Sequence, residues 1–277
     1  MEKQKKYERL RIIIYNSLYL LPAGGMTLYV KPGMDGSSVG DCPFAHFVRM
    51  VLAEKGLEYD LVPSTRESKP RWLVDDYSGK MPALRHRKEC YVDSDVIVQY
   101  LDFFFPEPEL SLTPGPTTGG SASTRADDVA DVERANAAAE GFLPAMARYV
   151  KHRPNGDDED DGRRASFERK LRDVEDCLSD GDGDGDVGGG GGRRRTGPYL
   201  VGDGARFTLL DCSMAPKLYA MDVCLRELKG GSIDVSGSYP RLREYMDALF
   251  DRPSFRSTAE YGPETIVWGW TSHLNKE

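Results

Sequence analysis

The chain has 277 residues, enough for two domains that share an interface, and it carries a formal net charge of −8. This acidic balance, with no basic face interleaved with aromatic residues, argues against a nucleic-acid partner. Five cysteines, an odd number, favour reduced thiols in a reducing compartment over a disulfide framework.

Residues 1–25 are ambiguous because basic residues precede an apolar run over residues 12–21, an order that resembles a secretory signal. The run is too short to span a bilayer as a helix, and Glu2 and Glu8 do not suit a transit peptide. We interpret residues 1–25 as an N-terminal extension or a targeting segment. The expected location is cytoplasmic, with a plastid as the alternative, and no membrane contact is expected.

Residues 26–108 alternate between strand and helix signals. Met26 to Lys31 is a β-prone run, and a glycine-rich loop over residues 33–40 leads to a helix that starts with Pro43 and stops at Gly56. Its apolar stripe has helical spacing and comprises Phe44, Phe47, Val48, Val51 and Leu52. This places Cys42 at the N-terminus of a helix.

The rest of this region predicts a small sheet with two further helices. Leu57 to Val62 indicates a strand, and Lys69 to Asp76 a short helix. Residues 82–85 and 89–92 are typical of a hairpin, and a helix follows to Phe104, with Ser94 as its expected N-cap.

A stretch rich in Thr, Pro, Gly and Ser predicts a linker over residues 109–124, and only helical patterns follow. The expected helices of the 125–277 domain are Ala126 to Val150, Arg164 to Leu178, Leu209 to Leu228 and Tyr239 to Phe250. Thr208 with Asp211 resembles a capping box at the start of the third.

Two insertions, residues 155–162 and 180–197, contain almost no large apolar residue and are expected to be disordered. Asp180, Asp182 and Asp184 imitate the start of a calcium-binding loop. Gly191 stands where the bidentate glutamate belongs, so no metal site is expected.

Cys42 is the candidate nucleophile. Backbone N–H groups and the positive end of the helix dipole favour a thiolate at a helix N-terminus, whereas the other four cysteines fit buried structural positions. Because Ala45 occupies the position three residues on, no Cys-x-x-Cys pair can form. A second thiol must come from solution.

Two further motifs suit a peptide ligand. In thioredoxin-like domains a cis proline at the place of Met81-Pro82 leaves a backbone edge free to pair with a peptide. Asp93, Ser94 and Asp95 open a helix whose N–H groups can hold a carboxylate.

Together these motifs resemble plant-type dehydroascorbate reductases, a branch of the glutathione transferase superfamily. The resemblance runs from Met26 to Trp270 and is carried by Val30-Lys31, Gly40-Asp41-Cys42-Pro43-Phe44, Lys69-Pro70-Arg71-Trp72, Gly79-Lys80-Met81-Pro82, Asp93-Ser94-Asp95-Val96-Ile97-Val98, Leu209-Leu210-Asp211, Ala215-Pro216-Lys217-Leu218-Tyr219 and Gly269-Trp270. It implies an α/β thioredoxin-like N-terminal domain and an all-α C-terminal helical bundle, in a monomer.

The resemblance also implies an activity, the glutathione-dependent reduction of dehydroascorbate. Cys42 would be the redox nucleophile, and Lys31 and Asp41 would hold the substrate. The implied glutathione-binding residues are Phe44, Lys69, Met81, Pro82, Asp93 and Ser94. Glutathione would be a co-substrate, and no tightly bound cofactor is implied. Cys42 would become a sulfenic acid, then a mixed disulfide, and a second glutathione would release it.

One position departs from this pattern, since Ala220 stands where the plant enzymes have a histidine near the site. Three alternatives remain open: an omega-type glutathione transferase with thioltransferase activity, a membrane-associating protein like the chloride intracellular channel proteins, and a silent glutathione-binding protein on the same fold.

Overall fold

The computed structural model describes residues 25–111, 122–153, 161–179 and 195–272. The expected extension, nearly all of it, lies outside the described residues, and so do most of the linker and of both insertions. Residues 195–197 of the second insertion are described, and Thr196 donates its backbone N–H to the Asp203 carbonyl at 2.7 Å. This end of the insertion is therefore ordered, contrary to expectation.

The first half is built on a four-stranded sheet with the order β2-β1-β3-β4. Its strands are β1 (Met26–Val30), β2 (Tyr59–Pro63), β3 (Ala83–His86) and β4 (Glu89–Val92). β1 pairs parallel to β2 through a helical crossover, whereas β3 is antiparallel to both β1 and β4. In β1 the side chains of Met26, Leu28 and Val30 alternate into the core, as the period of a strand requires.

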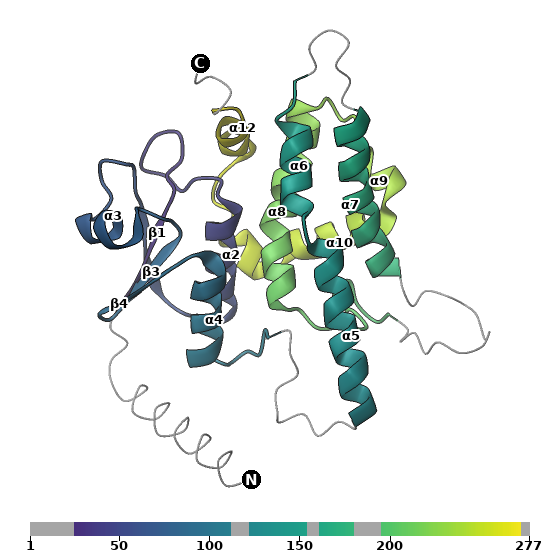
Figure 1. Cartoon of the computed structure of the whole chain (residues 1–277), viewed down its shortest axis with the longest axis horizontal. Helices are drawn as coiled ribbons and strands as arrows, with labels where there is room; N and C mark the ends of the chain where they lie inside the picture. Colours follow the sequence, from purple (N-terminus) through teal and green to yellow (C-terminus); the bar gives the residue numbers. More distant parts are fainter. Residues whose placement is uncertain (1–24, 112–121, 154–160, 180–194, 273–277) are drawn as a thin grey trace, which may run out of the picture.

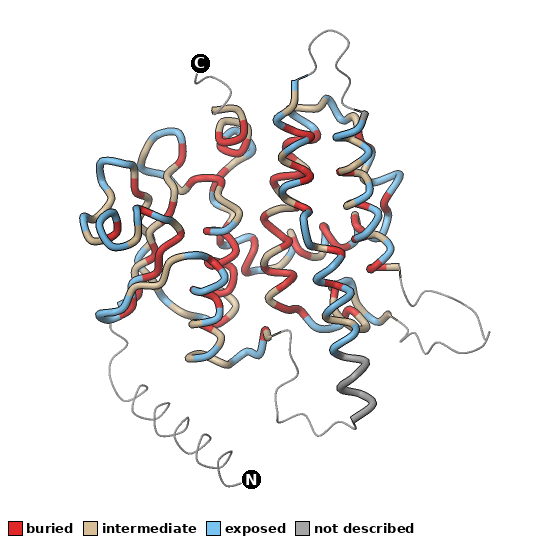
Figure 2. Tube along the Cα trace, viewed as in Figure 1, coloured by how far each residue is buried: buried red, intermediate tan, exposed pale blue. Residues whose placement is uncertain are grey.

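Three helices belong to this half: α2 (Pro43–Glu54), α3 (Arg71–Tyr77) and α4 (Ser94–Phe104). α2 and α4 cover the sheet face that is turned toward the helical half, and α3 lies on the other side (Figure 1). α2 is buried along most of its length because α8 packs against its second face (Figure 2).

In its described residues the second half has helices as its only regular secondary structure. Its helices are α5 (Ala122–Ala139), α6 (Phe142–Val150), α7 (Asp161–Ser179), α8 (Leu209–Leu228), α9 (Val235–Ser238), α10 (Pro240–Asp251), α11 (Pro253–Arg256) and α12 (Pro263–Thr271). α8 matches its predicted bounds, and the capping box of Thr208 and Asp211 is confirmed. None of the described helices is long and apolar enough to cross a membrane.

The structure corrects three local predictions. The helix expected over residues 126–150 is two helices, α5 and α6, because Gly141 adopts a left-handed conformation with φ of 70° between them. The N-cap of α4 is Asp93, which accepts a hydrogen bond from the Asp95 N–H at 3.0 Å, so Ser94 is the first helical residue. The terminal helices α11 and α12 are additional to those predicted.

A buried polar network joins α2 to the segment around α11. The Thr258 hydroxyl donates to the Ser254 carbonyl at 2.6 Å, so His46 Nε2–H donates to Thr258 Oγ1 at 2.9 Å. His46 Nδ1 is therefore unprotonated and accepts from the Tyr261 hydroxyl at 2.6 Å. Burial, reinforced by the nearby Arg49 charge, lowers the pKa of His46 to about 3. The imidazole is thus neutral.

Arg49 makes a second set of bonds across the same contact. Its side chain, only 2 % exposed, donates to the Thr258 carbonyl at 2.8 Å and pairs with Glu260 at 2.8 Å. A buried guanidinium needs such partners, since its desolvation is otherwise unfavourable. These bonds fix α2, and with it the residues at its N-terminus, against the C-terminal part of the chain.

Candidate active site

The candidate site lies at one edge of the sheet, where three strand ends meet. Tyr29 of β1 is opposite Ala83 of β3, which is opposite Val92 of β4. The residues that follow β1, precede β3 and follow β4 therefore lie side by side, and they include Lys31, Pro82 and Asp93. Three of the motifs singled out from the sequence are brought together in this way.

The loop between β1 and α2 folds back so that its two ends meet. Gly40 donates its N–H to the Lys31 carbonyl at 2.9 Å, and a Cβ at this position would lie only 2.5 Å from the Pro32 carbonyl oxygen. Only glycine permits this approach. As a result Asp41 comes beside Lys31, and the Lys31 Nζ to Asp41 Oδ1 distance is 2.9 Å, with the Asp41 side chain only 6 % exposed.

Cys42 is the N-cap residue of α2 and is partly exposed. Burial raises the pKa of its thiol; hydrogen bonds from the backbone N–H groups of Ala45 and Phe44 and the Lys31 charge lower it, and the Asp41 charge raises it further. The net pKa lies above the ordinary value, which corrects the sequence-based expectation of a thiolate. Desolvation outweighs the helix N-terminus here.

The implied glutathione-binding residues surround this edge. Lys69 donates from Nζ to the Gly79 carbonyl at 2.7 Å, which ties it to the turn before Met81. The Met81-Pro82 peptide bond is cis, as the sequence context predicted. Ser94 is buried at the first position of α4, and Phe44 projects from the first turn of α2 with 45 % of its surface exposed.

α12 forms a further wall of the site. The Lys31 ammonium lies 5.7 Å from the centre of the Trp268 ring, within the range of a cation–π contact. A Cβ on Gly269 would collide with the Asp41 carboxylate, so the helix approaches Asp41 closely only because this residue is glycine. Gly269-Trp270 belongs to the motifs that carry the resemblance, whereas the role of Trp268 was not predicted from the sequence. Pro263 and the apolar residues after it are the signal that could have indicated this helix.

The other four cysteines do not lie in the cluster that Cys42 forms with Lys31 and Asp41. Cys177, Cys212 and Cys224 are buried, as predicted, and Cys90 on β4 is only partly buried. All five cysteines are free, so the structure contains no disulfide.

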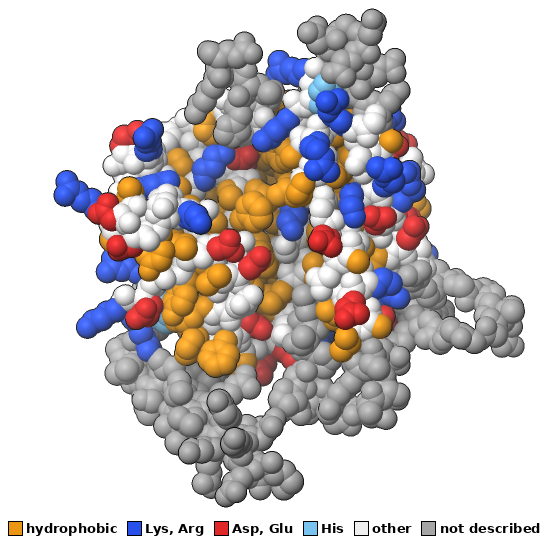
Figure 3. All heavy atoms as spheres, in the orientation of Figure 1, with side chains coloured by type: hydrophobic (Ala, Val, Ile, Leu, Met, Phe, Trp, Pro, Cys, Tyr) orange, Lys and Arg blue, Asp and Glu red, His pale blue; other side chains and the backbone are white. Residues whose placement is uncertain are grey.

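Hydrophobic side chains gather in the strip between the two halves, with Lys and Arg side chains around its upper part (Figure 3).

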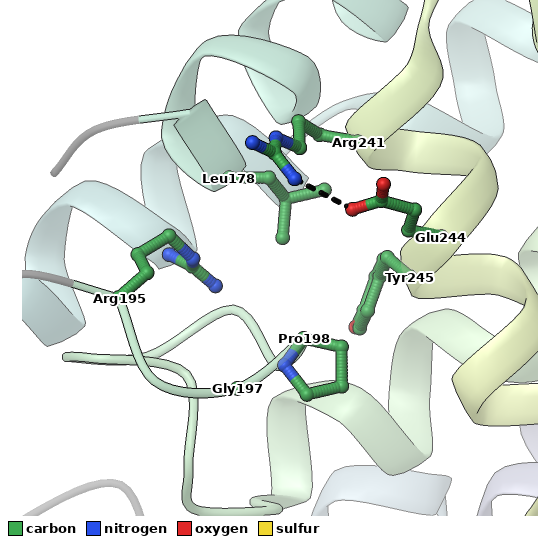
Figure 4. A pocket seen from close by; sticks show the side chains of 7 residues that line it. All are labelled: Leu178, Arg195, Gly197, Pro198, Arg241, Glu244 and Tyr245. Atoms are coloured by element: carbon green, nitrogen blue, oxygen red, sulfur yellow. Dashed lines mark hydrogen bonds and ion pairs between the residues drawn. The ribbon is translucent and has the colours of Figure 1, made fainter. Parts of the chain in front are cut away.

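A separate pocket of about 250 Å³ opens between α7, α10 and the 195–198 segment (Figure 4). Arg195 and Arg241 line it together with Tyr245, and Arg241 bonds Glu244 at 2.8 Å. None of its lining residues belongs to the cluster around Cys42, so we do not assign it to the same chemistry.

Comparison with known proteins agrees with this arrangement. Residues 38–109 match the N-terminal domain of glutathione S-transferases, and residues 130–248 match their C-terminal domain. The chain is 30 % identical to glutathione S-transferase DHAR2 of Arabidopsis thaliana over 238 residues, which cover 86 % of this chain and 92 % of that protein.

Two more similarities bear on the alternatives. The structure of Chlamydomonas reinhardtii dehydroascorbate reductase superposes with a TM-score of 0.67 at 26 % identity, covering 91 % of this chain and all of that one. Human chloride intracellular channel protein 3 is 26 % identical over 249 residues, which cover 87 % of this chain and 94 % of that protein.

Proposed function

Because this chain belongs to the glutathione S-transferase family, we propose that it uses glutathione to reduce dehydroascorbate to ascorbate at Cys42. The observation that carries the proposal is the cluster of Lys31, Asp41 and Cys42 at the N-terminus of α2. It sets a nucleophile next to a cation and a carboxylate that can hydrogen-bond the oxygens of a small polyhydroxylated substrate. The similarity to a structurally characterised dehydroascorbate reductase supports the same substrate.

The steps follow from a single reactive thiol. Cys42 loses its proton, and its thiolate attacks dehydroascorbate to form a covalent adduct. Water then adds its oxygen to the Cys42 sulfur as ascorbate departs, so Cys42 becomes a sulfenic acid. One glutathione converts the sulfenic acid to a mixed disulfide and releases that water, and a second glutathione frees Cys42 as oxidised glutathione leaves. Dehydroascorbate thus gains the two electrons that two glutathione thiols lose. Ala45 agrees with this route, because the helix offers no resolving thiol at that position.

Glutathione is proposed to lie along the strand edge. Met81 would pair with its backbone, with Pro82 shaping that edge, while Asp93 and Ser94 would receive its γ-glutamyl end at the start of α4. Lys69 would reach the other end of the tripeptide, and Phe44 would pack near its sulfur. In this placement the glutathione thiol faces Cys42.

The test follows ascorbate formation by absorbance, with dehydroascorbate and glutathione as substrates. We expect turnover in the wild type and its loss in Cys42→Ser, while Cys90→Ser, at a partly buried cysteine outside the cluster, remains active. Turnover that persists in Cys42→Ser would refute Cys42 as the nucleophile. A wild type that binds glutathione but does not exceed the uncatalysed rate would refute the reductase.

A thioltransferase is the second candidate, since the same single thiol can exchange with a mixed disulfide. The exposed Phe44 beside Cys42 favours a larger, apolar disulfide substrate over a sugar-like one. Comparing kcat/KM for dehydroascorbate and for a mixed disulfide of glutathione with an aromatic thiol separates the two functions. A much higher value for the disulfide would favour the thioltransferase.

A further inference from the structure

One side of α4 carries a stripe of apolar side chains that the described residues leave partly or largely exposed. The stripe consists of Val96, Tyr100, Phe103 and Phe104, at the i, i+4, i+7 and i+8 spacing of one helix face. Val96 is 48 % exposed and Phe103 is 62 % exposed, the highest value among the large apolar side chains of the described residues. Figure 3 shows hydrophobic side chains gathered over α4. We call this stripe the outer face of α4.

The aromatic rings of the outer face pack against one another. The ring of Tyr100 stacks on that of Tyr91 in β4 with centres 4.0 Å apart, and it lies 4.8 Å from the ring of Phe104. Phe104 in turn meets Phe103 edge to face at 5.0 Å. Because these contacts already hold the rings, a segment that covers them costs little further side-chain entropy.

The chain enters the fold beside this face. Met26, the first residue of β1, is opposite His86, the last residue of β3. The His86 Nδ1 atom lies 2.5 Å from the Tyr100 hydroxyl oxygen, and its ring centre lies 6.2 Å from that of Phe105. Residues directly opposite each other in antiparallel strands point to the same side, so Met26 also lies on the α4 side of the sheet. Residues 1–24 therefore join the fold next to the C-terminal end of the outer face.

His86 provides a second observation at the same place. Its side chain is buried, and its Nε2 atom has no hydrogen-bond partner in the part of the chain that the structure describes. A buried ring nitrogen without a partner is unfavourable, so we expect a polar group from outside that part to lie beside it. Tyr15, Asn16 and Tyr19 carry such groups.

The apolar run of residues 12–21 has the length and position to cover the outer face. From Leu21 to Met26 the chain spans at most about 18 Å, so the run begins close to the fold. The stripe from Val96 to Phe104 is about 12 Å long, and the run spans about 15 Å even as a helix. Such a short tether gives an effective concentration in the millimolar range, which favours this segment over a free protein.

We propose that residues 12–21 pack on the outer face of α4, as a strap that begins beside His86 and runs toward Val96. In this direction residues 1–11, which contain five Lys or Arg and two Glu, extend toward the exposed Asp95 at the start of α4. The charges of the strap and of this end of α4 are therefore complementary. The proposal is independent of the proposed function, because no residue of the outer face belongs to the proposed glutathione site.

The experiment measures backbone amide hydrogen exchange by mass spectrometry, in peptides of the full chain that cover residues 12–21. The variants are Phe103→Ser and, as a matched control, Val74→Ser. Val74 is a 46 % exposed apolar residue of α3, which lies on the other side of the sheet (Figure 1). A second measurement places the photoreactive residue p-benzoylphenylalanine at position 103 or at position 74 and identifies the peptide to which it cross-links.

We expect residues 12–21 of the wild type to exchange about tenfold or more slowly than an unstructured chain, because packing on α4 protects them. Phe103→Ser should remove most of this protection, since it deletes the most exposed ring of the face, whereas Val74→Ser should change it less than twofold. Position 103 should cross-link to residues 12–21 within one molecule, and position 74 should not.

Three results would overturn the proposal. The first is exchange of residues 12–21 at the unstructured rate in the wild type, and the second is protection that Phe103→Ser leaves unchanged. The third is a cross-linked product of twice the chain's mass, which would assign the outer face to a second copy.

Discussion

The buried imidazole of His46 predicts a loss of stability in mild acid. Its pKa is about 3 in the folded protein, compared with an ordinary value of 6.5. Between these two pH values the unfolded chain binds a proton at His46 and the folded protein does not. The contribution of His46 to stability is complete above the unfolded value and is lost as the pH falls from 6.5 toward 3. The physical reason is that burial disfavours the charged imidazole, and the Arg49 charge adds to this. Protonation would also leave the Tyr261 hydroxyl without its acceptor.

The magnitude follows from the two values. One pKa unit corresponds to about 1.4 kcal/mol, and for a single site with these pKa values the loss between pH 7 and pH 5 is about 2 kcal/mol. The assay is urea unfolding of the wild type and of His46→Asn at both pH values. Asparagine does not titrate, and its amide oxygen can still accept from Tyr261.

The decisive quantity is a difference between the two proteins: how much more unfolding free energy the wild type loses between pH 7 and pH 5 than His46→Asn does. Other titrating groups contribute equally to both proteins, so the wild type should lose about 2 kcal/mol more than His46→Asn. The absolute stability of His46→Asn does not enter this comparison. Parallel losses in the two proteins would refute the assignment of a neutral, buried His46.

Three further predictions concern the site and its support. The rate of Cys42 alkylation by iodoacetamide should still increase above pH 9, because burial raises the pKa of its thiol. Asp41→Asn should speed the reaction at pH 7.5, because the Asp41 charge also raises this pKa. An alkylation rate that stops increasing by pH 7 would contradict this prediction. Gly269→Ala should lower kcat/KM for dehydroascorbate by about 10- to 100-fold, since the new methyl group displaces the Asp41 carboxylate, and unchanged kinetics would show that the contact is unimportant. Arg49→Met should cost about 2 kcal/mol in urea unfolding, because the Thr258 carbonyl loses its donor, whereas a neutral result would mean that water replaces it.

The sequence predicted the sheet half well because its signals are local. Pro43 marks the start of α2, Gly56 follows its end, and the spacing from Phe44 to Leu52 records the buried stripe. The resemblance supplied what local pattern could not, namely that Lys31 and Asp41 belong to one site. Their meeting depends on Gly40, whose need for close backbone approach is visible only in the folded loop.

Other features could not be predicted because they depend on contacts between distant segments. The burial of Cys42, which reverses the expected direction of its pKa shift, comes from packing against the hydrophobic core and cannot be read from its place at a helix N-terminus. His46 and Arg49 occur in a helical pattern as ordinary polar positions, and only the structure pairs them with residues more than 200 positions away. The break at Gly141 was hidden by continuous helical propensity on both sides.

The bonds from α2 to the segment around Thr258 also have a consequence for synthesis. Arg49 leaves the ribosome 209 residues before Thr258, an interval of roughly 10 to 40 seconds at 5–20 residues per second. Until then α2 of the nascent chain carries His46 and Arg49, whose hydrogen-bond partners at Thr258 and Tyr261 have not yet been synthesised. We therefore expect a chain that stops before residue 250 to remain a substrate for chaperones rather than a finished domain, although it contains every strand and Cys42.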